Sequence, residues 1–256
     1  MKAGCEPAVV ILHYGSAATT RRLHEQLLAG DPAFAQRVFV LDNHAPEVYP
    51  GAWLRTDANL FWAGAFELAA RLTAEMGASH LWFMNNDILF LTKPPHLGRA
   101  FARLAKLEGF LGMIGLYSPA VDKNPYHPQM VADPSLQYRT VRLADGVAPL
   151  MNLAALKEIG GLDCADNPRG YGVDLALSWR LRQAGWNIVV DHQAIIRHRY
   201  HSSARATEGF LEQAARDEEA YLRKRLGPDH RALVEAAKKD YRDSAVFGPP
   251  DRETRA

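Results

Sequence analysis

The first two thirds of the chain alternate short apolar runs with stretches that repeat apolar residues at helical spacing. Three apolar runs predict strands at residues 8–13, 38–41 and 81–84. Between them, apolar positions three and four residues apart predict one helix after Gly15-Ser16 and another over 61–76. This alternation predicts an α/β fold with a mostly parallel, Rossmann-like sheet and helices on both faces.

Polar side chains stand where each of these predicted strands ends. The three clusters are His13-Tyr14, Asp42-Asn43 and Asn85-Asn86-Asp87. In open parallel sheets, ligands bind beyond the carboxyl ends of the strands, so the clusters are expected to share one crevice. Burying amides and a carboxylate without partners costs several kcal/mol, whereas such oxygens suit a hard divalent cation and the diphosphate it carries. Taken alone, the last cluster fits a water-facing strand end equally well, and the convergence of all three favours a ligand site.

The middle of the chain is less regular. Four prolines between 117 and 145 predict a long irregular excursion or a short edge hairpin. Beyond it, the pattern predicts two helices that end at glycines, over 151–159 and 173–184, and two short strands at 188–190 and 194–196. The main domain is therefore expected to span residues 1–203.

A charge-dense segment follows this domain. Over 207–243, apolar residues at loosely helical spacing predict one or two amphipathic helices broken at Gly227-Pro228. They are expected to pack on the main domain or on a second subunit, which would give a homodimer. Balanced charge disfavours a membrane-surface helix. We therefore expect a helical extension over 204–247 and a disordered tail over 248–256.

Composition narrows the class of protein. The 256 residues carry 30 Lys and Arg against 29 Asp and Glu, and this balance argues against nucleic acid as a partner. No apolar run approaches the roughly 20 residues that span a bilayer, and residues 1–7 lack the apolar core of a signal peptide. Cys5 and Cys164 show no metal-type spacing. Two free thiols are typical of a cytoplasmic protein.

Seven short motifs, in order and spacing, together resemble the family 2 glycosyltransferases over about residues 8–203. They are His13-Tyr14-Gly15, Leu41-Asp42-Asn43, Asn59 with Gly64 in Asn-Leu-Phe-Trp-Ala-Gly-Ala, Asn85-Asn86-Asp87, Gly160-Gly161-Leu162-Asp163, Val173-Asp174-Leu175-Ala176, and His198. The resemblance implies the GT-A fold and transfer of a sugar from a nucleotide-sugar donor. Where the family has further acids, this chain has Val173 and Ala176, and family glycines have become Phe61 and Ala65.

The resemblance also implies a donor site for a UDP- or dTDP-sugar with Mn²⁺ or Mg²⁺. Asp87 would ligate the metal and His198 would complete its coordination, with His192 and His201 as substitutes. Asn85 and Asn86 would orient the ribose or the waters of the metal. Asp42 would accept the ring N–H of the base, His13 and Tyr14 would pack near it, and Asn59 and Gly64 would border the same pocket.

Asp174 is the implied catalytic base. It would take the proton of the acceptor hydroxyl as that oxygen attacks opposite the leaving diphosphate, which inverts the anomeric configuration. The acceptor itself stays unassigned. The missing acids at Val173 and Ala176 keep a second class open, a non-catalytic nucleotide-sugar-binding or assembly module on the same fold. A nucleotidyltransferase is disfavoured, because His13-Tyr14-Gly15-Ser16-Ala17 is not a Gly-rich, basic phosphate loop.

Each site residue also has a plainer interpretation. Asp42 suits a cap of the next helix, Asn59 suits a helix N-cap, and Asp174 suits an acid at a helix start. Asp87 suits a structural strand end and His198 a surface position. Trp62, Trp179 and Trp186 fit packing as well as sugar contact.

Overall fold

The computed structural model describes residues 7–167, 169–199 and 209–249. Within these ranges the strands are β1 Ala8–His13, β2 Val38–Asp42, β3 Leu54–Arg55, β4 His80–Asn85, β5 Ile88–Phe90, β6 Ile114–Val121, β7 Tyr138–Val141, β8 Leu150–Asn152, β9 Asn187–His198 and β10 Tyr241–Ser244. They form one 10-stranded sheet, in the order β10-β7-β9-β6-β8-β4-β1-β2-β3, with β5 paired to β9 off this path.

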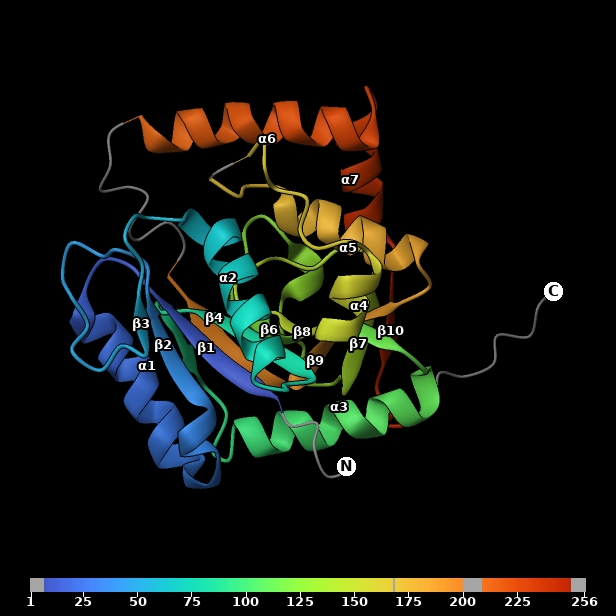
Figure 1. Cartoon of the computed structure of the whole chain (residues 1–256). Helices are drawn as coiled ribbons and strands as arrows, with labels where there is room; N and C mark the ends of the chain where they lie inside the picture. The colour runs from blue at the N-terminus through green and yellow to red at the C-terminus, as the bar shows by residue number, and fades with distance from the viewer. Residues whose placement is uncertain (1–6, 168, 200–208, 250–256) are drawn as a thin grey trace.

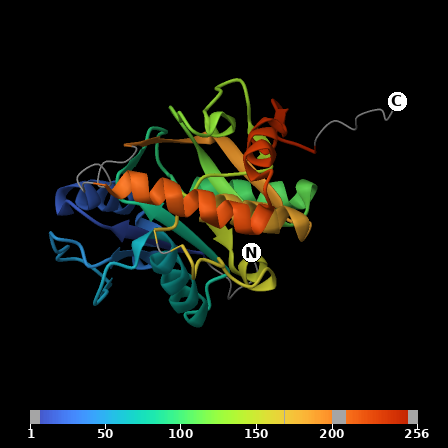
Figure 2. The same cartoon turned by 90° about the horizontal axis from the view of Figure 1, so that it is seen from above.

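Helices cover both faces of this sheet, as Figures 1 and 2 show from two directions. The longer ones are α1 Ala17–Gly30, α2 Phe61–Glu75, α3 Leu97–Leu111, α4 Leu153–Glu158, α5 Val173–Gln183, α6 Phe210–Leu226 and α7 His230–Lys239, and the short 3₁₀ turns are η1 Pro32–Arg37 and η2 Pro128–Met130. The two views place α2 and α4 on one face and α1 and α3 on the other. None of these helices is long and apolar enough to cross a membrane.

The first half of the sheet is parallel, as the sequence predicts. β1 lies between β2 and β4, and all six of its residues are buried. The register sets His13 opposite Asp42 and Leu12 opposite Asn85. The polar strand ends therefore lie along one edge of the sheet, which confirms the predicted convergence.

Antiparallel pairing enters beyond β4, where the predicted pattern is wrong in detail. The irregular excursion predicted over 117–145 is shorter than expected, because β6 continues to Val121, parallel to β9 and antiparallel to β8, and β7 begins at Tyr138. Pro119 is tolerated there since the β6–β9 register shifts between Pro119 and Ala120, a position where no ladder N–H is needed. The two short strands expected at 188–190 and 194–196 are one strand, β9.

The C-terminal segment forms the two predicted helices, broken at Gly227, which takes a left-handed φ of 87°. α6 packs on α5 and α7, and α7 packs on η2. Figure 1 shows α6 crossing the top of the molecule above α2 and α5. The chain then returns to the sheet, where β10 pairs antiparallel with β7, a strand that the apolar pattern does not predict. A homodimer through these helices stays a prediction.

The expectations for the two cysteines, for His201 and for the C-terminal tail are tested only in part. Cys164 carries a free thiol, whereas Cys5, His201 and residues 250–256 of the predicted tail lie outside the described residues. Within the described part of the tail, the backbone oxygen of Gly248 accepts a hydrogen bond of 2.8 Å from the Tyr138 hydroxyl. This contact ties at least the start of the predicted tail to β7.

Candidate active site

A cavity of about 970 Å³ lies between the carboxyl ends of the central strands and the covering helices α6 and α7. Seven residues that the sequence singled out line it: Tyr14, Asn59, Asn85, Asn86, Asp87, Asp174 and His198. Its volume falls at the upper end of ordinary small-molecule sites, which have volumes of about 300–1,000 Å³. Residues more than 100 positions apart in the chain thus meet in one space.

Asp87 and His198 form a close pair in the lining of this cavity. β5 runs antiparallel to β9 with Ile88 opposite His198, and this register brings the two side chains together. The His198 Nε2 atom lies 3.1 Å from the Asp87 carboxylate, and the two side chains are 8% and 12% exposed. Nearby, the Oδ1 atom of Asn85 is buried and accepts no hydrogen bond from the described residues.

These donors fit a divalent cation. Carboxylate and amide oxygens suit Mg²⁺ and Mn²⁺, and imidazole extends the set toward Mn²⁺. The described ranges contain no group of three or more His, Cys, Asp or Glu side chains that could hold a metal ion. A cation here would therefore take most of its ligands from a bound substrate and water. The substitute His192 does not line the cavity, and its Nδ1 accepts the backbone N–H of Asp133 at 2.8 Å.

Asn86 has internal partners besides facing the cavity. Its Nδ2 donates to the Tyr14 backbone oxygen at 3.1 Å and to the Thr20 hydroxyl at 2.8 Å. The same hydroxyl lies 2.6 Å from His13 Nδ1, and His13 Nε2 lies 2.6 Å from the Glu47 backbone oxygen. This chain of hydrogen bonds fixes the end of β4 against the end of β1.

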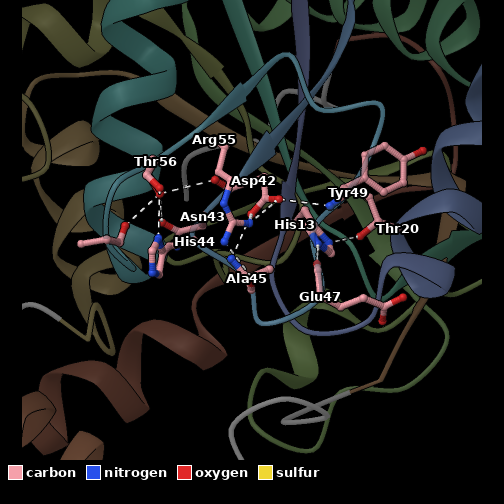
Figure 3. A network of polar contacts seen from close by, with 11 residues as sticks. His13, Thr20, Asp42, Asn43, His44, Ala45, Glu47, Tyr49, Arg55 and Thr56 are labelled. Carbon is pink, nitrogen blue, oxygen red and sulfur yellow. Dashed lines mark hydrogen bonds and ion pairs between the residues drawn. The ribbon is translucent and has the colours of Figure 1, made fainter.

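Asp42 lies in the dense polar network of Figure 3. Its carboxylate accepts the backbone N–H groups of Ala45 at 2.9 Å and Tyr49 at 3.1 Å, and Arg55 donates to it at 2.7 Å. Burial works to raise the pKa of Asp42, but these three donors outweigh it and lower the pKa. Its oxygens are thus taken up within the protein, by a loop between β2 and β3 and not by the start of a helix as the capping interpretation had it.

Asp42, His13 and Gly64 do not line the cavity. Gly64 lies on α2, where an added Cβ would come 3.1 Å from the Cβ of Leu60. The predicted contacts of these three residues with a nucleotide stay predictions. From the end of β2 it is Asn43 that reaches the lining, a residue that the sequence marks only as part of a polar strand end.

Asn59 is not the N-cap of α2, which is Leu60, but it lies directly before that helix start. It lines the cavity, and its Oδ1 accepts the backbone N–H of Phe61, the first residue of α2, at 2.8 Å. Asn43 Nδ2 donates to the same oxygen at 2.9 Å. Phe61 has a left-handed φ of 53°, which is rare for an aromatic residue and typical of functional sites.

Asp174 lines the cavity from the first turn of α5. Its carboxylate accepts the backbone N–H groups of Gly146 at 2.8 Å and Leu175 at 2.9 Å. Burial comes first among the causes that raise its pKa, to about 7, and the negative charges of Asp145 and Glu218 add to it. The side chain keeps some exposed surface because it faces the cavity. A carboxyl with a pKa near neutrality can take up a proton during a reaction.

The two positions where the family has further acids, residues 173 and 176, do not line the cavity in this protein. Val173 is 0% exposed and Ala176 is 2% exposed, both within the core. Four other acids line the cavity, and sequence reasoning missed them all: Asp145, Glu218, Glu219 and Glu235. Asp145 lies in a stretch expected to be irregular, and Glu218 resembles any charged residue of an amphipathic helix.

Aromatic side chains complete the lining, chief among them Trp62, Tyr126, Tyr171 and Phe210. The Trp62 ring packs so closely on Gly146 that an added Cβ there would come 2.8 Å from Cζ2 of the indole. Its buried Nε1 has no hydrogen-bond acceptor among the described residues. In contrast, Trp186 is a packing residue that donates to Glu158 at 3.1 Å.

Solved structures resemble this architecture over nearly the whole chain. GalNAc-T7 with UDP, GalNAc and Mn²⁺ matches with a TM-score of 0.62 and 12% identity, over 92% of this chain and 52% of the other. The mannosyltransferase PcManGT from Pyrobaculum calidifontis, with GDP-Man and Mn²⁺, matches with a TM-score of 0.61 and 12% identity, over 93% and 72%. S. aureus TarS matches with a TM-score of 0.55 and 13% identity, over 90% and 42%. The chain has the GT-A fold.

Sequence comparison adds relatives without an assigned activity. Uncharacterized proteins of Mycobacterium tuberculosis and Mycobacterium bovis are 32% identical over 144 residues, which is 55% of this chain and 54% of theirs. The chain therefore spans about half the length of the curated relatives it matches. No family model matches the sequence. The activity is accordingly inferred from the site.

Proposed function

We propose that this protein is an inverting, metal-assisted glycosyltransferase that moves a sugar from a UDP- or dTDP-sugar to a hydroxyl acceptor. The observation that carries the proposal is the shared cavity, which the Asp87–His198 pair and Asp174 all line. The former supplies donors for a cation and its diphosphate, and the latter supplies a proton acceptor. Both GT-A structures solved with Mn²⁺ hold a nucleotide or nucleotide sugar, which supports the same ligand class here.

Each group has a role in the bond changes. A divalent cation held by Asp87 and His198 would neutralise the charge that collects on the departing diphosphate. As the acceptor oxygen bonds to the anomeric carbon, the bond from that carbon to the diphosphate breaks and its electron pair leaves with the diphosphate. Asp174 takes the proton of the hydroxyl. Attack from the side opposite the leaving group inverts the configuration at this carbon.

A thermal-shift panel of UDP, dTDP and GDP, with and without Mn²⁺, tests the donor half of the proposal. A ligand that binds only the folded state stabilises it, by about 3 kcal/mol when the ligand is at a hundredfold excess over Kd. The melting temperature rises as a result. We expect UDP or dTDP to do so in the presence of Mn²⁺. Asp87→Ala should remove the Mn²⁺-dependent part, and exposed Glu75→Ala serves as its matched control.

Two results would contradict the proposal. If no nucleotide raises the melting temperature, the site does not take a nucleotide sugar. If Mn²⁺ has no effect on any nucleotide, Asp87 and His198 are not a metal site. A third result would favour the non-catalytic alternative: donors bind, yet no UDP is released in an acceptor screen. The apolar residues Val173 and Ala176, which replace family acids, are the features that support this alternative.

A further inference from the structure

Helix α6 touches the backbone directly before the proposed base. A Cβ built on Gly172 would lie 3.0 Å from Cγ of Glu218 and 3.2 Å from Cγ of Leu222. Gly172 has a left-handed φ of 77° and is the N-cap of α5, two residues before Asp174. Only a residue without a side chain permits this approach at this φ. The contact brings Glu218 to the same end of the cavity as Asp174.

Ion pairs hold α6 in this position. Arg225 donates to Asp163 at 2.9 Å and to Asp166 at 2.7 Å, and the Tyr221 hydroxyl donates to the Asp163 backbone oxygen at 3.1 Å. Arg169 pairs with Asp217, the neighbour of Glu218. The backbone that carries Glu218 is thus fixed on both sides.

The cations that line this part of the cavity already have other partners. Lys238 pairs with Glu235 at 2.7 Å, Arg231 pairs with Glu219 at 2.9 Å, and Arg169 pairs with Asp217. Asp145 accepts from Asn124 at 2.6 Å, a neutral donor. Within the described ranges, neither Asp174 nor Glu218 has a Lys or Arg in salt-bridge range. Among the described residues, the lining also holds Tyr126 and His127 from the loop before η2, Tyr171 before α5, and His230 of α7, which lies 3.1 Å from Glu219.

We propose that Glu218 and Asp174 act as a carboxylate pair, in which the charge of Glu218 adds to that of Asp145 and raises the pH at which Asp174 accepts the acceptor proton. This rests on the proposed function and makes α6 part of the reacting site. Two carboxylates in one enclosed space resist joint ionisation, so one proton is held at a higher pH than either would hold it alone. The burial of Glu218 and the charge of Glu219 raise the pKa of Glu218 in turn, and Lys238 opposes them.

Glu218 is therefore a positioning residue that acts through Asp174. The acceptor proton passes to Asp174, the acceptor oxygen bonds to the anomeric carbon, and the diphosphate leaves with the electron pair of the broken bond. Release of products lets Asp174 return the proton to water. The second carboxylate, which the buried Val173 and Ala176 do not supply from α5, comes instead from α6.

The pH profile of transfer by Glu218→Gln tests this pairing. We expect the midpoint of its acidic limb to move about one unit below that of the wild type, because the like charge is gone. The rate at about pH 6 should then rise several-fold relative to the wild type at the same pH. Glu212→Gln, an exposed change on the same helix, should leave the midpoint in place. An unmoved midpoint in Glu218→Gln overturns the proposal.

A second measurement needs no acceptor. Carbon-13 NMR of protein labelled at aspartate carboxyls, with the Asp174 signal assigned through Asp174→Asn, follows the titration directly. Glu218→Gln should lower the midpoint of Asp174 from about 7. Glu218→Ala removes the same charge without burying an amide and should do likewise if the glutamine variant folds poorly. If the titration midpoint of Asp174 does not change, the pairing is wrong even if transfer occurs. If the midpoint shifts but no transfer is found, only the proposed activity is wrong.

Discussion

Asp42 at the end of β2 and Asp174 at the start of α5 are both acids, and the protein treats the two carboxylates in opposite ways. Around Asp42, Arg55 and two backbone N–H groups outweigh burial and lower the pKa. Around Asp174, burial dominates and the acids Asp145 and Glu218 add to it, raising the pKa to about 7. One region supplies positive partners to its acid, and the other gathers further acids.

The contrast in partners suggests that one carboxylate stabilises the fold and the other takes part in a reaction. The network at the end of β2 is complete within the chain, so it holds loops in place whether or not a ligand is present. At the start of α5, acids are placed together against their own repulsion, which a stable fold alone would avoid. Perturbed carboxyls that face a cavity are typical of reacting sites. We therefore expect Asp42 to serve the architecture, and we propose Asp174 for the reaction.

The largest expected effect is the loss of transfer in Asp174→Asn. The amide keeps the shape of the side chain but cannot take the proton, and we expect the rate to fall by about a thousandfold. Donor binding, measured by the thermal shift with UDP and Mn²⁺, should be unchanged. Exposed Asp57→Asn is the control, and it should retain full activity. Full activity of Asp174→Asn would show that Asp174 is not the base. The contrast between the surroundings of Asp42 and Asp174 would then carry no functional meaning.

A smaller effect is expected from Asp42→Asn, on stability. The change removes the charge that pairs with Arg55 and replaces one accepting oxygen by a donor that faces backbone N–H groups. We expect the free energy of unfolding to fall by about 3 kcal/mol, measured by urea denaturation at neutral pH. If stability is instead unaltered and UDP binding is lost, Asp42 recognises the uracil ring. Both carboxylates would then serve the ligand, and the contrast in their roles would be wrong.

The smallest expected effect is a slope of stability with pH. The pKa of Asp174 in the folded state, about 7, exceeds that of an unfolded aspartate. As pH rises, the unfolded state therefore loses its proton first, and folding loses about 1 kcal/mol per pH unit between about pH 5 and pH 7. Asp174→Asn should flatten this slope in urea titrations, whereas Asp57→Asn should leave it. An equal slope in the wild type and Asp174→Asn contradicts the raised pKa.

The parallel half of this architecture could be predicted because its signal is local. β1 and β4 are apolar runs buried on both faces, and their polar ends mark the ligand edge. The sequence alone therefore points to Asp87, Asn85 and Asp174, and all three line the cavity. β6 escaped prediction because Pro119 resembles a break, and only the shifted register with β9 accommodates it. α3 was not anticipated either.

The cover of the cavity could not be predicted, for a different reason. Nothing in residues 210–226 separates Glu218 from its exposed neighbours, since its environment is created by packing on Gly172, 46 positions earlier in the chain. Likewise, the Asp42–Arg55 pair depends on the parallel pairing of β2 with β3, which sets these two residues opposite each other. Tertiary contact, not local pattern, decides which acid becomes a partner and which becomes a base.

The position of α6 late in the sequence has a consequence for synthesis. The parallel strands and α5 leave the ribosome before Glu218 does, and chains generally fold from the N-terminus as they are made. The edge that gathers Asp87 and the ends of β1 and β4 can therefore form first, while the tuning charge arrives later. On the proposed function, the strand ends that would hold the donor are made before the acid that would tune the base, so donor binding would come before full turnover during synthesis.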